Sequence, residues 1–194
     1  DLTEIEPKNG DDIHTTINVQ MQDIAGQALR TALDYHKASY GTVIIMEVKS
    51  GNIKAMSNLK RDGGVFTEDY NYAAGLSTEP GSTFKLASVM AILEDKMMSL
   101  DKEFEINYGK SIISGREMKD SEGHGHAKLS LRRAFELSSN IGISKAVVEA
   151  YGGSREGSFK FVDRIKQFHL DKITGIDLPG EGKPQPCVLL HSIV

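Results

Sequence analysis

The chain has 194 residues, of which 39% are hydrophobic and 26% are charged, and these are ordinary values for a folded globular protein. Its net charge of −4 argues against a nucleic-acid-binding domain, which would be basic. The single cysteine, Cys187, excludes an internal disulfide framework. The longest apolar runs, such as residues 43–46, are far shorter than the ~20 residues of a membrane span. Any membrane anchor is therefore expected outside this chain.

The first part of the chain predicts a strand, a helix and a hairpin. Residues 1–11 are polar and indicate a linker. Alternating apolar residues predict a short strand over 12–18, and apolar residues recurring at three and four predict a helix over 19–36 with Asn18 as its N-cap. Residues 41–48 and 52–58 predict two strands around the turn Lys49-Ser50-Gly51. Residues 60–80 are predicted to be loop.

The second part of the chain predicts four helices and two stretches of irregular structure. Residues 84–98 are apolar at helical spacing and predict a helix that is buried on most sides, with Met90, Met97 and Met98 filling the core. Residues 99–127 predict irregular structure or short strands. Further helices are expected over residues 129–137, 143–151 and 158–168, and a loop over 175–186.

The most informative pattern is Ser-x-x-Lys, because a lysine of lowered pKa can take the proton of a serine three residues away on the same helix face. The pattern occurs at Ser57/Lys60, Ser82/Lys85 and Ser99/Lys102. Among these, only Ser82 stands at the head of a long apolar helix, preceded by Pro80-Gly81. Since helix starts favour proline and serine, a plain capping role for Ser82 stays open at this point.

A second pattern, Ser-x-Asn, occurs at Ser50/Asn52 and at Ser138/Asn140. The first pair lies in the predicted hairpin turn. The second lies between two predicted helices, where both side chains could project into a cleft. Capping of the following helix by Asn140 is the alternative.

Five segments, in order along the chain, resemble penicillin-binding protein transpeptidases. Residues 79–85, which contain Ser82 and Lys85, resemble the active-serine segment of that family, and residues 137–140 resemble its second motif. Residues 12–17, 47–56 and 174–181 are similar to other family segments. The likeness covers roughly residues 7–186 and is strongest to the monofunctional, class B enzymes of cell elongation and division.

The resemblance implies an α+β fold of the penicillin-binding protein and serine β-lactamase type, with helices packed on an antiparallel sheet and a second, helical lobe. Residues 1–11 would link to an N-terminal region, and 12–194 would form a partial transpeptidase domain, with its sheet part at 12–60 and its helical lobe at about 80–170. The only literal match to the third family motif, Lys49-Ser50-Gly51, precedes Ser82 and is rejected. We therefore expect the chain to stop before that motif, without the C-terminal strands and with an open sheet edge.

The same resemblance implies an acyl-serine mechanism. Ser82 would attack the penultimate D-alanine of a peptidoglycan stem peptide ending in D-Ala-D-Ala, with Lys85 as base. Ser138 would relay a proton, and Asn140 would hold the substrate amide and Lys85. β-Lactams would trap Ser82. No cofactor and no metal are expected. The site would work on the outer face of the bacterial cytoplasmic membrane, anchored by a segment outside this chain, with proteins of a division or elongation complex as partners.

Two other functions stay open. The chain could be a non-catalytic module or sensor that binds wall peptide or β-lactam, or, with less support, a serine β-lactamase. Residues 103–107 are similar to the deacylating loop of class A β-lactamases, but they precede Ser138 whereas that loop follows the second motif.

Several other features are interpreted as structural. His124 and His126 are expected to be solvated loop histidines, and Arg132 and Arg133 a solvated helix face. Residues 109–111 lack the glycine that a phosphate-binding loop requires upstream. Cys187 is given no catalytic role.

Overall fold

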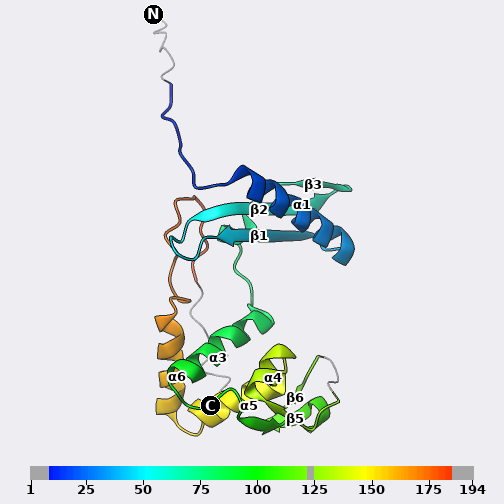
Figure 1. Cartoon of the computed structure of the whole chain (residues 1–194), viewed down its shortest axis with the longest axis vertical. Coiled ribbons are helices and arrows are strands. Elements are labelled where there is room, and N and C mark those ends of the chain that lie inside the picture. Colours follow the sequence, from blue (N-terminus) through cyan, green and yellow to red (C-terminus); the bar gives the residue numbers. More distant parts are fainter. Residues whose placement is uncertain (1–8, 122–124, 185–194) are drawn as a thin grey trace, which may run out of the picture. The chain divides into compact units, whose positions relative to one another are not determined.

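The computed structural model describes residues 9–121 and 125–184 (Figure 1). Contacts between residues divide this part of the chain into two compact units, and each is described by itself. The sheet unit contains residues 9–76 and Ile176–Gly182, and the helical unit contains Ser77–Gly175, except 122–124, together with 183–184. Helices and antiparallel strands occur as the α+β class requires, which confirms the predicted class.

The first helix of the sheet unit, α1 (Val19–His36), has the bounds that the sequence predicts. Asn18 caps it, since its side-chain oxygen accepts a hydrogen bond from Met21 N at 3.0 Å. Leu29 and Leu33, four residues apart, are buried against the sheet. The helix ends at His36, and the C-cap residue Lys37 adopts a left-handed conformation with φ 52°.

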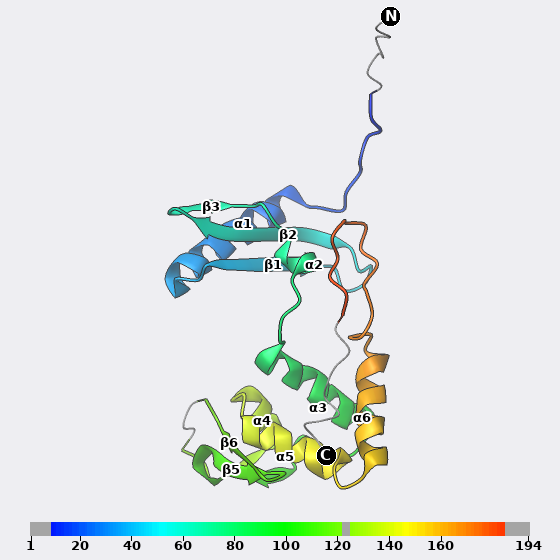
Figure 2. The same cartoon turned by 180° about the vertical axis from the view of Figure 1, so that it is seen from behind.

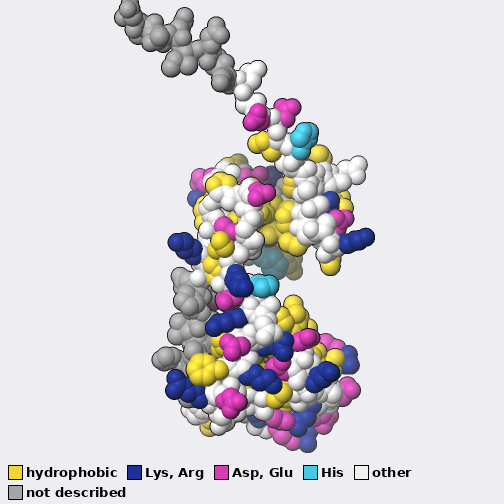
Figure 3. Space-filling view, turned by 90° about the vertical axis from the view of Figure 1, so that its left-hand side faces the viewer, with side chains coloured by type: hydrophobic (Ala, Val, Ile, Leu, Met, Phe, Trp, Pro, Cys, Tyr) yellow, Lys and Arg dark blue, Asp and Glu magenta, His cyan; other side chains and the backbone are white. Residues whose placement is uncertain are grey.

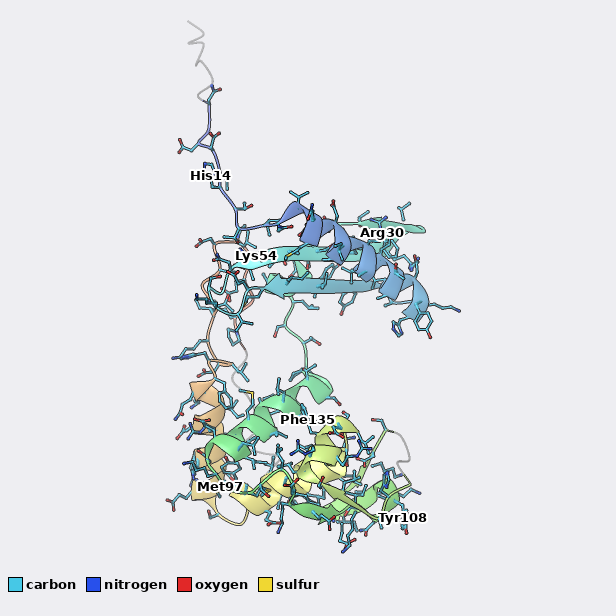
Figure 4. All side chains as sticks on the ribbon, viewed as in Figure 1. His14, Arg30, Lys54, Met97, Tyr108 and Phe135 are labelled. Carbon is cyan, nitrogen blue, oxygen red and sulfur yellow. The ribbon has the colours of Figure 1, made fainter. Side chains whose placement is uncertain are left out.

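Three antiparallel strands, β1 (Tyr40–Met46), β2 (Ile53–Asp62) and β3 (Val65–Thr67), form the sheet in the order β1-β2-β3. Figures 1 and 2, drawn from opposite sides, show α1 lying across one face of this sheet. Gly41 permits the close approach, because a Cβ there would lie 3.0 Å from a Leu33 methyl group. Figure 4 shows Arg30 of α1 near β3, and its guanidinium carbon lies 5.6 Å from the centre of the Phe66 ring.

The side chain of Gln22 joins α1 to β2 through two hydrogen bonds to one backbone position. Its Nε2 donates to the Met56 carbonyl at 2.8 Å, and its Oε1 accepts from the Met56 N–H at 2.9 Å. On the other face of the sheet a short helix, α2 (Tyr72–Gly75), contacts β1. There Tyr72 stacks on Tyr40 with the ring centres 4.7 Å apart.

Two predictions for the sheet unit are wrong. Residues 12–18 form no strand. They are exposed, Ile13 to 87%, so the alternating side chains do not pack against a sheet. Asn18 N donates to the Lys54 carbonyl at 2.9 Å, but this bond is not continued as a ladder. The region 60–80 is not all loop either, because β2 continues to Asp62 and β3 and α2 follow.

The helical unit contains four helices of six or more residues: α3 (Phe84–Glu94), α4 (Leu131–Glu136), α5 (Asn140–Tyr151) and α6 (Arg155–Gln167). The short 3-10 turn η1 (Gly81–Thr83) leads into α3. Two two-stranded sheets accompany them. In one, β4 (Glu103–Glu105) pairs with β7 (Lys128–Ser130), and in the other, β5 (Lys110–Ile113) pairs with β6 (Arg116–Lys119) after the turn η2 (Asn107–Gly109).

Helix α5 lies in the core of the helical unit and contacts α3, α4, α6 and strands β4, β5 and β6. Its buried side chains join those of the neighbouring elements in one hydrophobic cluster. On the surface, Figure 3 shows acidic and basic side chains interspersed over the helical unit, a distribution typical of a solvated face. Arg132 and Arg133, at the start of α4, are exposed, as predicted.

The prediction for α3 is wrong in its length and in part of its burial. The helix ends at Glu94, because the next residues turn back: Lys96 has φ 53°, and Met97 N donates to the Ile92 carbonyl at 3.0 Å. Met90 is 43% and Met97 40% exposed, so neither fills the core. Met97 lies at the C-terminal end of α3 near α6 (Figure 4), and only Met98 of the three packs against the cluster.

The other predicted helices differ in their starting points. Residues 128–130 form β7, so α4 begins at Leu131 rather than at 129. Helices α5 and α6 begin three residues earlier than predicted, since Ser139 and Ser154 cap them through hydrogen bonds from Gly142 N and Gly157 N. The expected short strands in 99–127 are present as β4, β5 and β6.

Candidate active site

Ser82 and Lys85 are brought together by the turn that opens α3. Ser82 is exposed in η1, Lys85 is half-buried in the first turn of α3, and Lys85 Nζ donates to Ser82 Oγ at 3.2 Å. Thr83, not Ser82, occupies the N-cap position of α3. The Ser82 hydroxyl therefore accepts a hydrogen bond from a lysine, whereas the hydroxyl of a capping serine would accept from backbone N–H groups.

Ser138 meets Lys85 from the turn between α4 and α5. Lys85 Nζ donates to Ser138 Oγ at 3.0 Å and to the Ser138 carbonyl at 2.5 Å. Ser138 has φ 53°, in the left-handed region that a non-glycine residue adopts only when its surroundings hold it there. One amine thus contacts the hydroxyl groups of two serines that are far apart in the sequence.

Burial lowers the pKa of Lys85 below the ordinary lysine value of 10.5, and the negative charge of Asp120 partly opposes this effect. A lower pKa increases the fraction of neutral amine near pH 7. A neutral amine can accept the proton of a serine hydroxyl, so the electrostatics of Lys85 suit a general base.

The amide nitrogen of Asn140 is directed to β6 and not to Ser82, Lys85 or Ser138. It is the first residue of α5, and its Nδ2 donates to the Lys119 carbonyl at the end of β6, at 2.8 Å. The residue that caps α5 is Ser139, whose Oγ accepts from Gly142 N at 2.9 Å. The structure therefore brings Ser82, Lys85 and Ser138 together and directs the Asn140 nitrogen to β6.

Sequence reasoning did not single out Asp120, which follows β6. Its carboxylate accepts hydrogen bonds from Ser139 Oγ at 2.8 Å and from Ile141 N at 3.0 Å. No spacing rule points to it, because it precedes Ser139 by 19 residues across a segment without a clear period. The pairing of β5 with β6 and the bond from Asp120 N to the Gly109 carbonyl at 3.1 Å carry this carboxylate to the start of α5.

The remaining sequence candidates add no site. Within residues 9–121 and 125–184, no group of three or more His, Cys, Asp or Glu side chains could hold a metal ion. His126 is exposed, while His124 and Cys187 lie outside the described residues. The described helices include none that is both long and apolar enough to cross a membrane.

The arrangement can therefore activate a nucleophile. A serine hydroxyl, a lysine of lowered pKa and a second hydroxyl meet at hydrogen-bonding distance, which is the set needed for acyl transfer by proton shuttling. The family model of the penicillin binding protein transpeptidase domain matches residues 41–186, most of the chain. The chain belongs to the penicillin-binding protein transpeptidase family.

Curated relatives of this transpeptidase family agree with that assignment. The stage V sporulation protein D of Bacillus subtilis is 28% identical over 185 residues, covering 91% of this chain and 27% of its own length. The probable peptidoglycan D,D-transpeptidase PenA of Neisseria meningitidis serogroup A is 30% identical over 145 residues, which cover 72% of this chain and 24% of that protein. The peptidoglycan D,D-transpeptidase FtsI of Escherichia coli K12 is 26% identical over 187 residues, which cover 93% of this chain and 30% of that protein. The chain thus spans 24–30% of the length of these relatives.

Solved structures of similar fold support the family fold. A peptidoglycan synthetase from Bifidobacterium adolescentis superposes with a TM-score of 0.70 and 26% identity, over 90% of this chain and 31% of that one. The transpeptidase domain of Burkholderia pseudomallei penicillin-binding protein 3 superposes with a TM-score of 0.72 at 20% identity, over 87% of this chain and 46% of that one. The predicted fold type is thereby confirmed.

Proposed function

We propose that this chain is part of a D,D-transpeptidase that cross-links peptidoglycan stem peptides through an acyl-Ser82 intermediate. The observation that carries the proposal is the position of the Lys85 amine, 3.2 Å from Ser82 Oγ and 3.0 Å from Ser138 Oγ. Membership of the family and the named activity of relatives such as FtsI and PenA support it.

In the first half of the reaction, Ser82 Oγ attacks the carbonyl carbon of the penultimate D-alanine and its proton passes to the neutral Lys85 amine. A carbon–oxygen bond forms and a tetrahedral intermediate results. The proton then moves from Lys85 through the Ser138 hydroxyl to the nitrogen of the terminal D-alanine. The peptide carbon–nitrogen bond breaks, D-alanine leaves, and an ester of Ser82 remains.

In the second half, an amine of a neighbouring stem peptide attacks the ester carbonyl. A new carbon–nitrogen bond forms, the ester bond breaks, and the proton lost by the amine returns to Ser82 Oγ. The Ser82 backbone N–H supplies one hydrogen bond to the developing oxyanion, a contact that contributes about 3–4 kcal/mol to such transition states. Asn140, whose nitrogen is bonded to the Lys119 carbonyl, fixes the start of α5 and offers its side-chain oxygen to the substrate amide.

Substrate, partners and place follow from this activity. The donor is a stem peptide that ends in D-Ala-D-Ala, and β-lactam antibiotics compete by acylating Ser82. The site works on the outer face of the bacterial cytoplasmic membrane. Proteins of a division or elongation complex are its partners.

The test is covalent labelling of the full-length protein by a fluorescent penicillin. We expect wild type to be labelled, Ser82→Ala to be unlabelled, and Ser99→Ala, which alters an exposed serine of another Ser-x-x-Lys pair, to be labelled like wild type. If wild type and Ser82→Ala are labelled equally, or neither is labelled, the assignment of Ser82 is wrong. Cross-linked product from a stem-peptide donor and an amine acceptor distinguishes a transpeptidase from a sensor, and rapid release of hydrolysed drug would indicate a β-lactamase.

The pH dependence of labelling tests the role of Lys85. The base must be neutral, so the acylation rate should rise with pH through the Lys85 pKa, which burial places below the ordinary value of 10.5. Lys85→Met should abolish this rise of the acylation rate with pH and most of the rate itself. If the residual rate of Lys85→Met still rises with pH as in wild type, another group is the base.

A further inference from the structure

Asp120 and its neighbour Lys119 bind three consecutive residues where α5 begins: the N-cap Ser139 and the first two helical residues, Asn140 and Ile141. The Asp120 carboxylate accepts from Ser139 Oγ at 2.8 Å and from Ile141 N at 3.0 Å, and the Lys119 carbonyl accepts from Asn140 Nδ2 at 2.8 Å. Ser139 and Ile141 are completely buried. Asp120 itself is partly buried, and hydrogen bonds to a carboxylate are stronger than those between neutral groups, so the end of β6 fixes the start of α5.

The residue that the turn between α4 and α5 carries is Ser138. On its N-terminal side, Ser138 N donates to the Phe135 carbonyl at 3.0 Å, at the end of α4. On its C-terminal side, the Asp120 contacts fix the next residues. A serine in the left-handed region is strained and persists only where neighbouring contacts hold it. Those contacts keep both Ser138 oxygens within 3.0 Å of Lys85 Nζ.

We propose that Asp120 is a positioning residue of the acyl-transfer site: by accepting hydrogen bonds from Ser139 and Ile141, it holds Ser138 with its hydroxyl and carbonyl on Lys85. The catalytic part of this inference rests on the proposed function. The bond from Ile141 N satisfies one of the free N–H groups at the start of α5, beside the Gly142 N–H that Ser139 Oγ accepts at 2.9 Å. Capping does not account for the second bond, from the Ser139 hydroxyl.

The same carboxylate also acts on the base by its charge. Asp120 raises the pKa of Lys85 against the larger lowering effect of burial. Asp120 therefore does two separable things at one site: it positions Ser138 by hydrogen bonds, and it favours the charged form of Lys85 by its field.

Two substitutions in the full-length protein separate these effects. In Asp120→Asn, the amide oxygen can still accept from Ile141 N and the amide nitrogen can donate to Ser139 Oγ, so the geometry is kept and the charge is lost. In Asp120→Ala, both are lost. Asp101→Asn is the matched control, since the Asp101 side chain is 85% exposed and its Oδ1 lies 3.9 Å from Arg132.

The first readout is acylation by a fluorescent penicillin over a concentration series, which separates binding from the acylation step. We expect Asp120→Ala to lower the acylation step by about 10–100-fold, as small misplacements of catalytic groups do, with a smaller change in binding. Asp120→Asn should keep most of the rate. In Asp120→Asn the rise of the acylation rate with pH should move to lower pH, because removal of a negative charge lowers the Lys85 pKa further. A purely structural role of Asp120 would not move this rise.

The second readout needs no catalysis: amide hydrogen exchange at Ile141 and Gly142. Protection should fall in Asp120→Ala and persist in Asp120→Asn. If wild type is not labelled by penicillin, the proposed function fails, and exchange still decides whether Asp120 holds the turn. The inference is overturned if Asp120→Ala acylates like Asp101→Asn, or if exchange at these amides is unchanged. If Asp120→Ala does not fold, Ser139→Ala, which removes one of the two donors to the carboxylate, takes its place, and wild-type acylation with unchanged exchange at Ile141 in that variant overturns the inference.

Discussion

Three helices of the helical unit meet at a buried carboxylate, and the hydroxyl of Tyr151 is the contact that can be removed most cleanly. Asp95 lies at the end of α3 with its side chain 3% exposed. It accepts from Tyr151 Oη at 2.8 Å and from Arg164 Nε at 2.8 Å. The Tyr151 hydroxyl also lies 2.9 Å from the Ala91 carbonyl. Tyr151→Phe removes this hydroxyl and leaves the ring packed on Phe161.

The loss of stability expected for Tyr151→Phe depends on which hydrogen bonds Asp95 and the Ala91 carbonyl retain. Asp95 retains the bonds from Arg164, so the carboxylate is not left unpaired, and the Ala91 carbonyl retains its bond from Asp95 N at 3.0 Å. One hydrogen bond to a charged group is lost, which corresponds to about 1.5–3 kcal/mol. We expect Tyr151→Phe to lower the free energy of unfolding by about 2 kcal/mol, a shift of roughly 1 M in the urea midpoint.

Urea unfolding at pH 7 measures this cost, with Tyr108→Phe as control because Tyr108 is 67% exposed. A pH series adds a second check. Burial alone would raise the pKa of Asp95, but hydrogen bonds from Tyr151 and Arg164 and the charges of Arg164 and Lys160 outweigh it and lower that pKa. The stabilisation by the carboxylate is therefore complete above the unfolded value of about 3.9 and is lost as the pH falls through the lower folded value.

The difference between wild type and Tyr151→Phe should accordingly shrink below about pH 4. The reasoning is refuted if Tyr151→Phe costs no more than Tyr108→Phe at pH 7. A cost that stays constant down to the acid transition would show that the hydroxyl acts without the carboxylate.

Two further substitutions test how helices are joined to their neighbours. Gly142→Ala places a Cβ 2.5 Å from Ala134 Cβ, so it should lower the free energy of unfolding by about 1–3 kcal/mol and slow penicillin labelling; an unchanged urea midpoint would contradict this. Gln22→Ala removes both bonds to the Met56 backbone and should cost about 1–3 kcal/mol in the same assay. The exposed Gln20→Ala is its control, and equal midpoints for the two variants would contradict the role of Gln22.

The sequence predicted those features whose signals are local. Helix α1 was predictable to the residue because a capping asparagine, a spaced apolar face and a polar stop coincide. Alternation over residues 12–18 predicted a strand that does not form, since pattern alone cannot show whether a neighbouring strand is available. Met90 was predicted to be buried from its apolar surroundings, yet it faces outward from α3.

For the site, the Ser-x-x-Lys and Ser-x-Asn patterns located Ser82, Lys85 and Ser138, which the structure brings into contact. The direction of the Asn140 amide toward Lys119 could not be predicted, because it depends on where β6 ends. Asp120 was missed for the same reason. Its contacts with Ser139 and Ile141 are set by strand pairing rather than by sequence spacing.

Ser138 offers Lys85 one atom from its side chain and one from its main chain. The carbonyl is common to every amino acid, so whatever replaces this serine still presents an acceptor to the amine. In the proposed mechanism, the main chain of Ser138 holds the lysine and its side chain relays the proton. A glycine at position 138 adopts φ 53° without strain. Ser138→Gly would therefore keep the carbonyl that accepts from Lys85 and remove only the hydroxyl that the proposed mechanism uses for proton transfer.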